Sequence, residues 1–370
     1  MTEQVGRINI FEKTVEYFLS PILPFLRDPG VAEVMINRYD EIYIEKAGKL
    51  IKTDAKFSDH SAFMAAVNNV LQYTGKRLTS DSPLVDARLP DGSRVHVVLE
   101  PLARFGTCMA IRKFNKVVFD AQNLVSLGSW TPKAAEYIQC CALAEKNILV
   151  SGGTSSGKTS LLNVISSFIP ETERIVVIED SSELDLQQDH VVSLESRPAD
   201  RWGRGEITIS DLFKSSLRLR PDRIIIGETR GGEALDMIQA MTSGHSGSMS
   251  TLHANTALDT LNRLETLAMM NSIEMPLHAL RGQIASAVDV IVQVSRFNDG
   301  KRGLTQISEV LPLTDQSRYA VQDIFALEFD EHGGRTLVAT GTPSRFADEP
   351  KIKALNGIWA LSKDIFAPKQ

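Results

Sequence analysis

Residues 152–159 read G-G-T-S-S-G-K-T, which matches the pattern G-x-x-x-x-G-K-[ST] of a loop that wraps phosphate groups. The flanking sequence fits the local structure that such a loop requires. The run at 147–150 has strand character, and apolar residues recur at helical spacing from Ser160 to Phe168. Strand, loop and helix therefore follow one another in the order of a phosphate-binding fold.

The residue types in this loop suit a polyanion. Glycine at 152, 153 and 157 has no Cβ to obstruct a triphosphate or to forbid left-handed dihedrals. Successive amide N–H groups and the positive end of the following helix favour negative charge. Lys158 adds a charge near the β and γ phosphates, and the Thr159 hydroxyl is suited to hold Mg²⁺. The predicted nucleotide-binding residues are Gly152, Gly153, Thr154, Ser155, Ser156, Gly157, Lys158, Thr159 and Ser160. The alternative is a glycine-rich turn with an incidental lysine.

Length and charge narrow the class of protein. A chain of 370 residues is too long for one ordinary core and suits two domains. Its 46 acidic and 40 basic residues give a net charge of -6, so it lacks the basic excess that nucleic-acid binding usually needs. We see no secretory leader and no apolar stretch long enough to span a membrane. We therefore expect a cytoplasmic protein with no direct nucleic-acid partner.

Residues 1–114 predict a small α+β domain. A turn at Asp91-Gly92 supports a hairpin within it. The expected helices are Ile8–Leu19 and Ser61–Tyr73, and the expected strands are Val34–Asn37, Glu41–Glu45, Arg94–Leu99 and Thr107–Arg112, the first two forming a hairpin.

A fresh helix start at Thr131-Pro132 follows a stretch without sustained periodicity, because threonine can cap a helix and proline suits its first position. We therefore predict a linker at 115–130, an α/β domain at 131–312 and a small extension of short strands at 313–370. Strand-like and helix-like segments alternate in the α/β domain, which implies a largely parallel sheet covered by helices. The segments are 174–179, 191–194, 210–219, 223–227, 233–241, 248–252 and 258–270.

Acidic residues follow two of these strands. Glu179 and Asp180 end the first strand, and Glu228 ends the 223–227 strand. In a parallel sheet ligands bind beyond the carboxyl ends of the strands, so both glutamates can face the γ-phosphate. There they can hold Mg²⁺ or activate water. The alternative is that acids are common where strands end.

The segment 244–255, G-H-S-G-S-M-S-T-L-H-A-N, is small, polar and rich in glycine. We expect it to pack poorly and to approach a ligand, with His253 donating a hydrogen bond to the γ-phosphate. The alternative for His253 is that it caps the helix that follows. Either of two arginine groups can grip phosphate or form ion pairs on the surface. One group surrounds the second acidic strand (Arg218, Arg220, Arg223 and Arg230), and the other lies in the first domain (Arg94, Arg104 and Arg112).

Four motifs together resemble the motor ATPases of type II and type IV secretion and type IV pili. They are the phosphate loop at 152–159, I-E-D at 178–180, I-I-I-G-E-T-R at 224–230 and the histidine-containing segment at 244–255. In the N-terminal region, E-V-M-I-N at 33–37, E-I-Y-I-E at 41–45 and I-R-K-F at 111–114 resemble the tight-adherence (Tad, Flp or Cpa) pilus branch, as does Q-D-I-F at 322–325. The tetracysteine zinc module of many type II motors is absent from the sequence.

The resemblance implies a RecA-like P-loop domain behind the smaller N-terminal domain. It implies ATP and Mg²⁺ as cofactors, a hexamer at the cytoplasmic face of the inner membrane, and membrane platform proteins as partners. By analogy Lys158, Glu179, Glu228 and His253 are catalytic, and Thr159, Glu179 and Glu228 hold the metal. The arginines expected to contact nucleotide are Arg94, Arg104, Arg112 and Arg230. The runner-up is an ATPase that moves protein or DNA through a conjugation channel.

Overall fold

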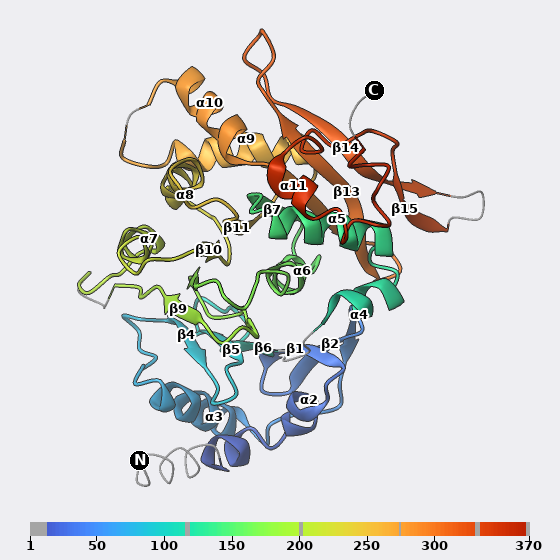
Figure 1. Ribbon diagram of the computed structural model, residues 1–370. Helices are drawn as coiled ribbons and strands as arrows, with labels where there is room; N and C mark the ends of the chain where they lie inside the picture. The colour runs from blue at the N-terminus through green and yellow to red at the C-terminus, as the bar shows by residue number, and fades with distance from the viewer. Residues whose placement is uncertain (1–12, 115–118, 200–202, 274, 330–333, 368–370) are drawn as a thin grey trace. The chain divides into compact units, whose positions relative to one another are not determined.

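The computed structural model describes residues 13–114, 119–199, 203–273, 275–329 and 334–367. The chain divides into two compact units, residues 1–117 and 118–370 (Figure 1). Each unit has its own hydrophobic core, and each is described by itself.

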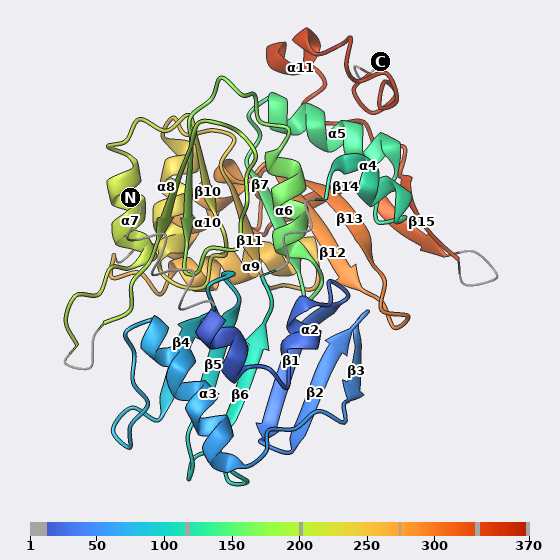
Figure 2. The same cartoon turned by 90° about the horizontal axis from the view of Figure 1, so that it is seen from below.

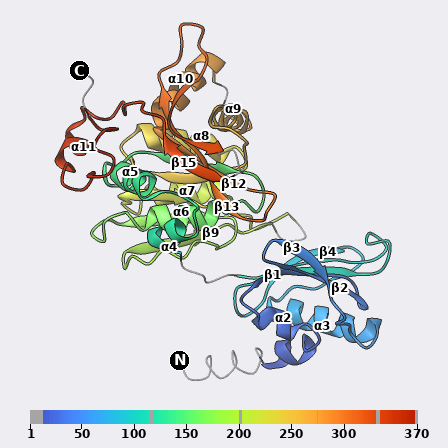
Figure 3. The ribbon, with the colours of Figure 1, turned by 90° about the vertical axis from the view of Figure 1, so that its right-hand side faces the viewer.

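The N-terminal unit is built on a six-stranded antiparallel sheet in the order β3-β2-β1-β6-β5-β4. Helices α2 (Leu23–Arg27) and α3 (His60–Tyr73) lie on one face of this sheet, as Figure 3 shows. Inward residues alternate with outward ones, so that Ile42 and Ile44 of β2 are buried, as expected for a sheet with one covered face. The strands are β1 (Val31–Arg38), β2 (Glu41–Lys46), β3 (Lys49–Lys52), β4 (Leu84–Arg88), β5 (Arg94–Val98) and β6 (Cys108–Arg112).

Several predictions for this unit are confirmed. The predicted hairpin exists, with Ile36 opposite Ile42, and α3 begins one residue earlier than expected. Gly92, at a φ of 89°, lies in the turn between β4 and β5. Of the predicted first helix, residues 8–12 lie outside the described residues, while 13–18 are helical.

The C-terminal unit contains a nine-stranded sheet in the order β15-β14-β13-β12-β7-β11-β10-β8-β9. The six strands from β12 to β9 are parallel, and β13, β14 and β15 extend the sheet antiparallel. The strands are β7 (Ile148–Gly152), β8 (Ile175–Glu179), β9 (Val191–Glu195), β10 (Arg223–Ile226), β11 (Met249–Leu252), β12 (Val290–Arg296), β13 (Arg302–Leu311), β14 (Ala320–Phe329) and β15 (Arg335–Ala339). The prediction of a largely parallel sheet is confirmed.

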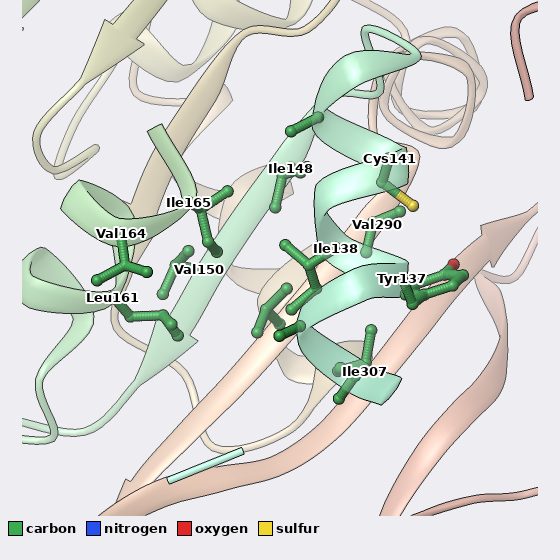
Figure 4. Close-up of a cluster of buried hydrophobic side chains, with 14 of the residues drawn as sticks. Tyr137, Ile138, Cys141, Ile148, Val150, Leu161, Val164, Ile165, Val290 and Ile307 are labelled. Atoms are coloured by element: carbon green, nitrogen blue, oxygen red, sulfur yellow. The ribbon is translucent and has the colours of Figure 1, made fainter. Parts of the chain in front are cut away.

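Helices cover both faces of this sheet (Figure 2). Helices α5 (Pro132–Leu143) and α6 (Lys158–Ser166) pack on one face against Ile148, Val150 and Val290 (Figure 4). The opposite face, which includes Leu149, packs against α7 (Ile209–Ser216), α8 (Glu233–Thr242), α9 (Ala257–Ala268) and α10 (Leu277–Ala287). Successive strand residues enter opposite cores, which is why these strands read as continuous apolar runs.

The structure differs from the sequence-based predictions in three places. Helix α4 (Ala121–Ser126), begun by a capping box at Asp120, lies where a linker without periodicity was expected. Helix α10 and strands β12 and β13 had no counterpart in the prediction. Within the predicted extension at 313–370, β14 and β15 belong to the main sheet, followed by α11 (Pro350–Ala354).

Among the described residues, no helix has both the length and the apolar composition needed to span a bilayer.

Candidate functional site

The phosphate loop joins β7 to α6, as its sequence predicts. Gly157 is the N-cap of α6 and has a left-handed φ of 96°. A Cβ on Gly152 would lie 2.3 Å from the carbonyl oxygen of Val294 on β12, so only glycine fits there. Among the described residues other than its chain neighbours, none has an atom within 4 Å of a Cβ built on Gly153. The predicted steric need for glycine is therefore supported at 152 and 157, while neighbouring protein atoms impose none at 153.

The Lys158 side chain folds back against the first two residues of this loop. Its side chain is largely buried, and its Nζ donates to the carbonyl oxygens of Gly152 at 3.1 Å and Gly153 at 3.0 Å. The same Nζ lies 3.3 and 3.4 Å from the two ring nitrogens of His253. Phosphate oxygens accept stronger, charge-assisted hydrogen bonds from an ammonium group than carbonyl oxygens do, so a phosphate group can replace these two carbonyl partners.

His253 and Glu228 lie beside Lys158. His253 follows the last residue of β11, and its Nε2 is 2.8 Å from Glu228 Oε1. Burial, followed by the charge of Lys158, lowers the pKa of His253, so its neutral form is favoured. The cap of α9 is instead Thr256, whose side chain accepts a hydrogen bond from Asp259 N. The alternative that His253 caps this helix is therefore wrong.

Arg230 binds the acids at the ends of two strands. It donates to Glu228 Oε2 at 2.6 Å and lies 3.4 Å from Asp180 Oδ2. Asp180 Oδ1 in turn accepts from Ser196 Oγ at 2.9 Å. Lys158, His253, Glu228, Arg230 and Asp180 thus form a chain of charged and polar contacts along the carboxyl edge of the sheet.

Glu179 is the most buried acid of the site, with 4% of its surface exposed. Its Oε1 accepts backbone hydrogen bonds from Glu183 at 2.8 Å and Leu184 at 2.9 Å. Burial raises its pKa to about 7, although these two hydrogen bonds act in the opposite direction. A Cβ on Gly227 would lie 2.9 Å from Glu179 Cγ, so the strand end that precedes Glu228 lies directly against Glu179.

The residues predicted to hold Mg²⁺ fit such an ion by their chemistry. Thr159 follows Lys158 in the first turn of α6, and its Oγ1 donates to Glu183 Oε2 at 3.4 Å. Hydroxyl and carboxylate oxygens are the ligands that Mg²⁺ takes from proteins, usually one or two beside phosphates and water. Among the described residues, no cluster of three or more His, Cys, Asp or Glu forms a metal site. These residues therefore fit a Mg²⁺ ion whose other ligands are phosphate oxygens and water.

The polar strand β11 is well packed, contrary to our expectation. Ser250 and Thr251 of β11, and Ser248 just before it, are almost fully buried, and their hydroxyl groups are hydrogen-bonded. Ser250 Oγ is 2.8 Å from Thr229 Oγ1, and Thr251 Oγ1 donates to the carbonyl oxygen of Gly227 at 2.8 Å. Buried hydroxyls are tolerated when they are hydrogen-bonded. The small polar side chains therefore bind β11 to the end of β10 instead of leaving it loose.

The predicted arginines divide into different roles. Arg230 reaches the site, but Arg223 is fully buried at the opposite end of β10, where it pairs with Glu173 and donates to the carbonyl oxygen of Ala142 at 3.1 Å. Arg94 and Arg112 lie opposite each other on the adjacent strands β5 and β6. They and Arg104 belong to the N-terminal unit, so their contact with nucleotide stays a prediction.

Two residues of this site, Glu183 and Arg302, were not predicted from the sequence. Glu183 provides the amide that binds Glu179 and the carboxylate that accepts from Thr159. It stands one turn after the acidic strand end, and an acid there could have been noticed. Arg302 on β13 donates to the carbonyl oxygen of Ser155 at 2.8 Å. It lies far from the loop in sequence, and no local pattern identifies it.

A cavity of about 680 Å³ lies elsewhere in the C-terminal unit. Asp289, Leu313, Arg345 and Glu349 are among its lining residues. It contains none of the predicted site residues. Asp289 Oδ2 accepts a hydrogen bond at 3.0 Å from the backbone N–H of Asn147, the residue just before β7. The phosphate loop follows the other end of β7, so the cavity is at the opposite edge of the sheet from this loop.

Comparisons with known proteins identify relatives of this chain. The family model described as type II/IV secretion system protein matches residues 18–341. The type IV secretion system protein PtlH of Bordetella pertussis is 32% identical over 311 residues, covering 77% of this chain and 91% of its own. The conjugal transfer protein TrbB of Rhizobium radiobacter is 30% identical over 338 residues, covering 90% and 99%.

Solved structures share the fold. The ATPase DotB of Legionella pneumophila superposes with a TM-score of 0.53 at 18% identity, covering 95% of this chain and 87% of that one. The pilus retraction motor PilT with bound ADP gives 0.53 at 17% identity, covering 94% and 89%. The predicted fold, a smaller N-terminal domain followed by a RecA-like α/β domain, is confirmed. On the strength of the family match and the curated relatives, this chain belongs to the type II/IV secretion system protein family.

Proposed function

We propose that this protein is a Mg²⁺-dependent ATPase that acts as the motor of a membrane secretion or pilus-assembly machine. The supporting observation is that Lys158, Glu228 and His253 meet at one edge of the sheet, with distances of 2.8 to 3.4 Å between neighbouring polar atoms. Glu179, from the next strand end, lies against Gly227. This is where a parallel α/β sheet binds its ligands.

The roles follow from the chemistry of each group. Lys158 exchanges its two carbonyl partners for phosphate oxygens, and His253, neutral at physiological pH, donates to the γ-phosphate. Both hydrogen bonds from the 183–184 turn end on Glu179 Oε1, which leaves Oε2 to accept a proton from the attacking water. When bound, Mg²⁺ neutralises charge on the phosphates, with Thr159 and Glu228 as its protein-side partners.

The machine that we propose is a tight-adherence type IV pilus assembly system, on the basis of the N-terminal motifs at 33–37 and 41–45. In this proposal the protein works as a homohexamer at the cytoplasmic face of the inner membrane. It pushes on platform proteins that add pilin subunits, and Arg94, Arg104, Arg112 and Arg230 contact nucleotide.

A second candidate is a type IV secretion or conjugation ATPase that moves protein or DNA. The names of the relatives favour it, since PtlH is a type IV secretion protein and TrbB a conjugal transfer protein. Deletion of the gene in its host separates the two. Loss of surface pili with unchanged plasmid transfer supports the pilus motor, and the reverse result supports the second candidate.

The enzymatic proposal is tested with purified protein. Phosphate release from ATP is measured with Mg²⁺ and with excess chelator, in the wild type, in Lys158→Ala and in Lys56→Ala, an exposed lysine of the N-terminal unit. We expect Mg²⁺-dependent turnover that Lys158→Ala abolishes and Lys56→Ala keeps. Tight ATP binding without phosphate release in the wild type would instead identify a nucleotide-binding scaffold. Mass in solution with a nonhydrolysable analogue tests the hexamer.

A further inference from the structure

Arg302 is the first residue of β13 and contacts the phosphate loop. Its Nε donates to the carbonyl oxygen of Ser155 at 2.8 Å. Its Cδ would lie 3.3 Å from a Cβ on Gly157. Ser155 has a φ of 57°, a left-handed conformation that a non-glycine residue adopts only when its surroundings hold it there. A charged hydrogen bond to its own carbonyl group is such a restraint.

The backbone of Arg302 is fixed on both sides. Its carbonyl oxygen accepts from Ser129 Oγ at 3.0 Å, and Leu304 N donates to the Ser129 carbonyl oxygen at 2.8 Å. The preceding strand, β12, is paired with β7, and Val294 lies opposite Gly152. The β12–β13 hairpin therefore fixes the backbone from which the Arg302 side chain reaches the loop.

The contact acts on the backbone of the loop. Amide groups that converge on a phosphate require their carbonyl groups to point away from it. A guanidinium bound to the Ser155 carbonyl stabilises that orientation. It also places a positive charge beside the loop.

We propose that Arg302 is a positioning residue of the phosphate loop, which holds Ser155 in its left-handed conformation so that the loop is preorganised for the triphosphate tail whatever the base. The proposal rests on the proposed nucleotide binding. It assigns to β13, outside the four sequence motifs, a function in the same site.

The test uses the full chain and two competitors of a fluorescent ATP analogue, namely ATP and sodium tripolyphosphate. Arg302→Ala is compared with Arg302→Lys, which keeps a charged donor, and with Lys301→Ala, which removes the neighbouring exposed charge. We expect both competitors to bind Arg302→Ala about tenfold more weakly, the effect of losing one charge-assisted hydrogen bond. Arg302→Lys should recover most of the loss, and Lys301→Ala should stay within about twofold of the wild type.

Two results would overturn the proposal. One is unchanged affinity of Arg302→Ala for both competitors, and the other is a loss for ATP alone, which would assign Arg302 to the nucleoside. Arg302→Gln replaces Arg302→Ala if thermal unfolding without nucleotide shows that the alanine variant is less stable than Lys301→Ala. Failure of the proposed function is recognised separately, because the wild type itself would then not bind the fluorescent analogue.

Discussion

Glu179→Gln should stabilise the folded protein at alkaline pH while it abolishes ATP turnover. Burial raises the pKa of Glu179 from 4.5 to about 7, so the folded state binds its proton more tightly than the unfolded chain does. Ionising this carboxyl group therefore costs folding free energy at high pH. Glutamine carries no charge, and its Oε1 can still accept from the amides of Glu183 and Leu184.

The expected size follows from the two pKa values. Each tenfold change in acidity is worth about 1.4 kcal/mol, so at pH 8.5 the ionised carboxylate destabilises the fold by about 3 kcal/mol. At pH 5 the Glu179 carboxyl group is almost fully protonated in the folded state and about a quarter protonated in the unfolded state. Its raised pKa then lowers the free energy of unfolding by only about 1 kcal/mol. For a unit of this size 1 kcal/mol shifts the melting temperature by about 2 to 4 °C. The variant should gain about 5 °C or more over the wild type between pH 5 and pH 8.5.

Thermal unfolding without nucleotide, at both pH values, measures this difference. Glu171→Gln, an exposed acid in the turn after α6, is the matched control and should follow the wild type throughout. A gain in Glu179→Gln that is the same at pH 5 and pH 8.5 would contradict a raised pKa as its cause. A variant less stable than the wild type at pH 8.5 would show that the carboxylate stabilises the fold.

Three further outcomes test other parts of the structure. Gly247→Ala should cost about 3 kcal/mol or more of unfolding free energy in urea, because a Cβ there would lie 1.6 Å from the buried Arg223 Nη1 and φ is +78°. Gly341→Ala has a φ of +82° and, among the described residues beyond its chain neighbours, no atom within 4 Å of the added Cβ. It should cost only about 1 kcal/mol, so equal losses in the two variants would refute the clash. Thr159→Val should raise the Mg²⁺ concentration needed for half-maximal turnover by about tenfold, and an unchanged Mg²⁺ titration would remove Thr159 from the metal site. His253→Ala should lower kcat more than it weakens ATP binding, and equal losses in both would make His253 a simple binding residue.

The parts of the site that the sequence predicts are those set by local patterns. The phosphate loop is a contiguous motif between a strand and a helix, and Glu179 and Glu228 are found because parallel strands end at one edge. His253 is placed correctly for the same reason, since it directly follows β11.

The remaining parts depend on pairs that lie far apart in the chain. Arg302 and Ser155 are 147 residues apart, and nothing near either residue indicates the other. The burial of Ser250 depends on Thr229 from the neighbouring strand end, so the polar sequence of β11 suggests exposure until the strand order is known. The predicted strand at 223–227 puts Arg223 at the end away from Glu228, but its burial and its ion pair with Glu173 depend on a residue 50 positions away in the chain.

Strand β11 has a mechanical consequence. It is only four residues long, about 13 Å, and it is hydrogen-bonded to β7 on one side and β10 on the other. His253 follows one end, and Gly247 lies against Arg223 just before the other. A strand held by ladder hydrogen bonds on both sides cannot bend or slide without breaking them. Strand β11 therefore fixes the distance between His253 at one end and the Arg223 ion pair near the other.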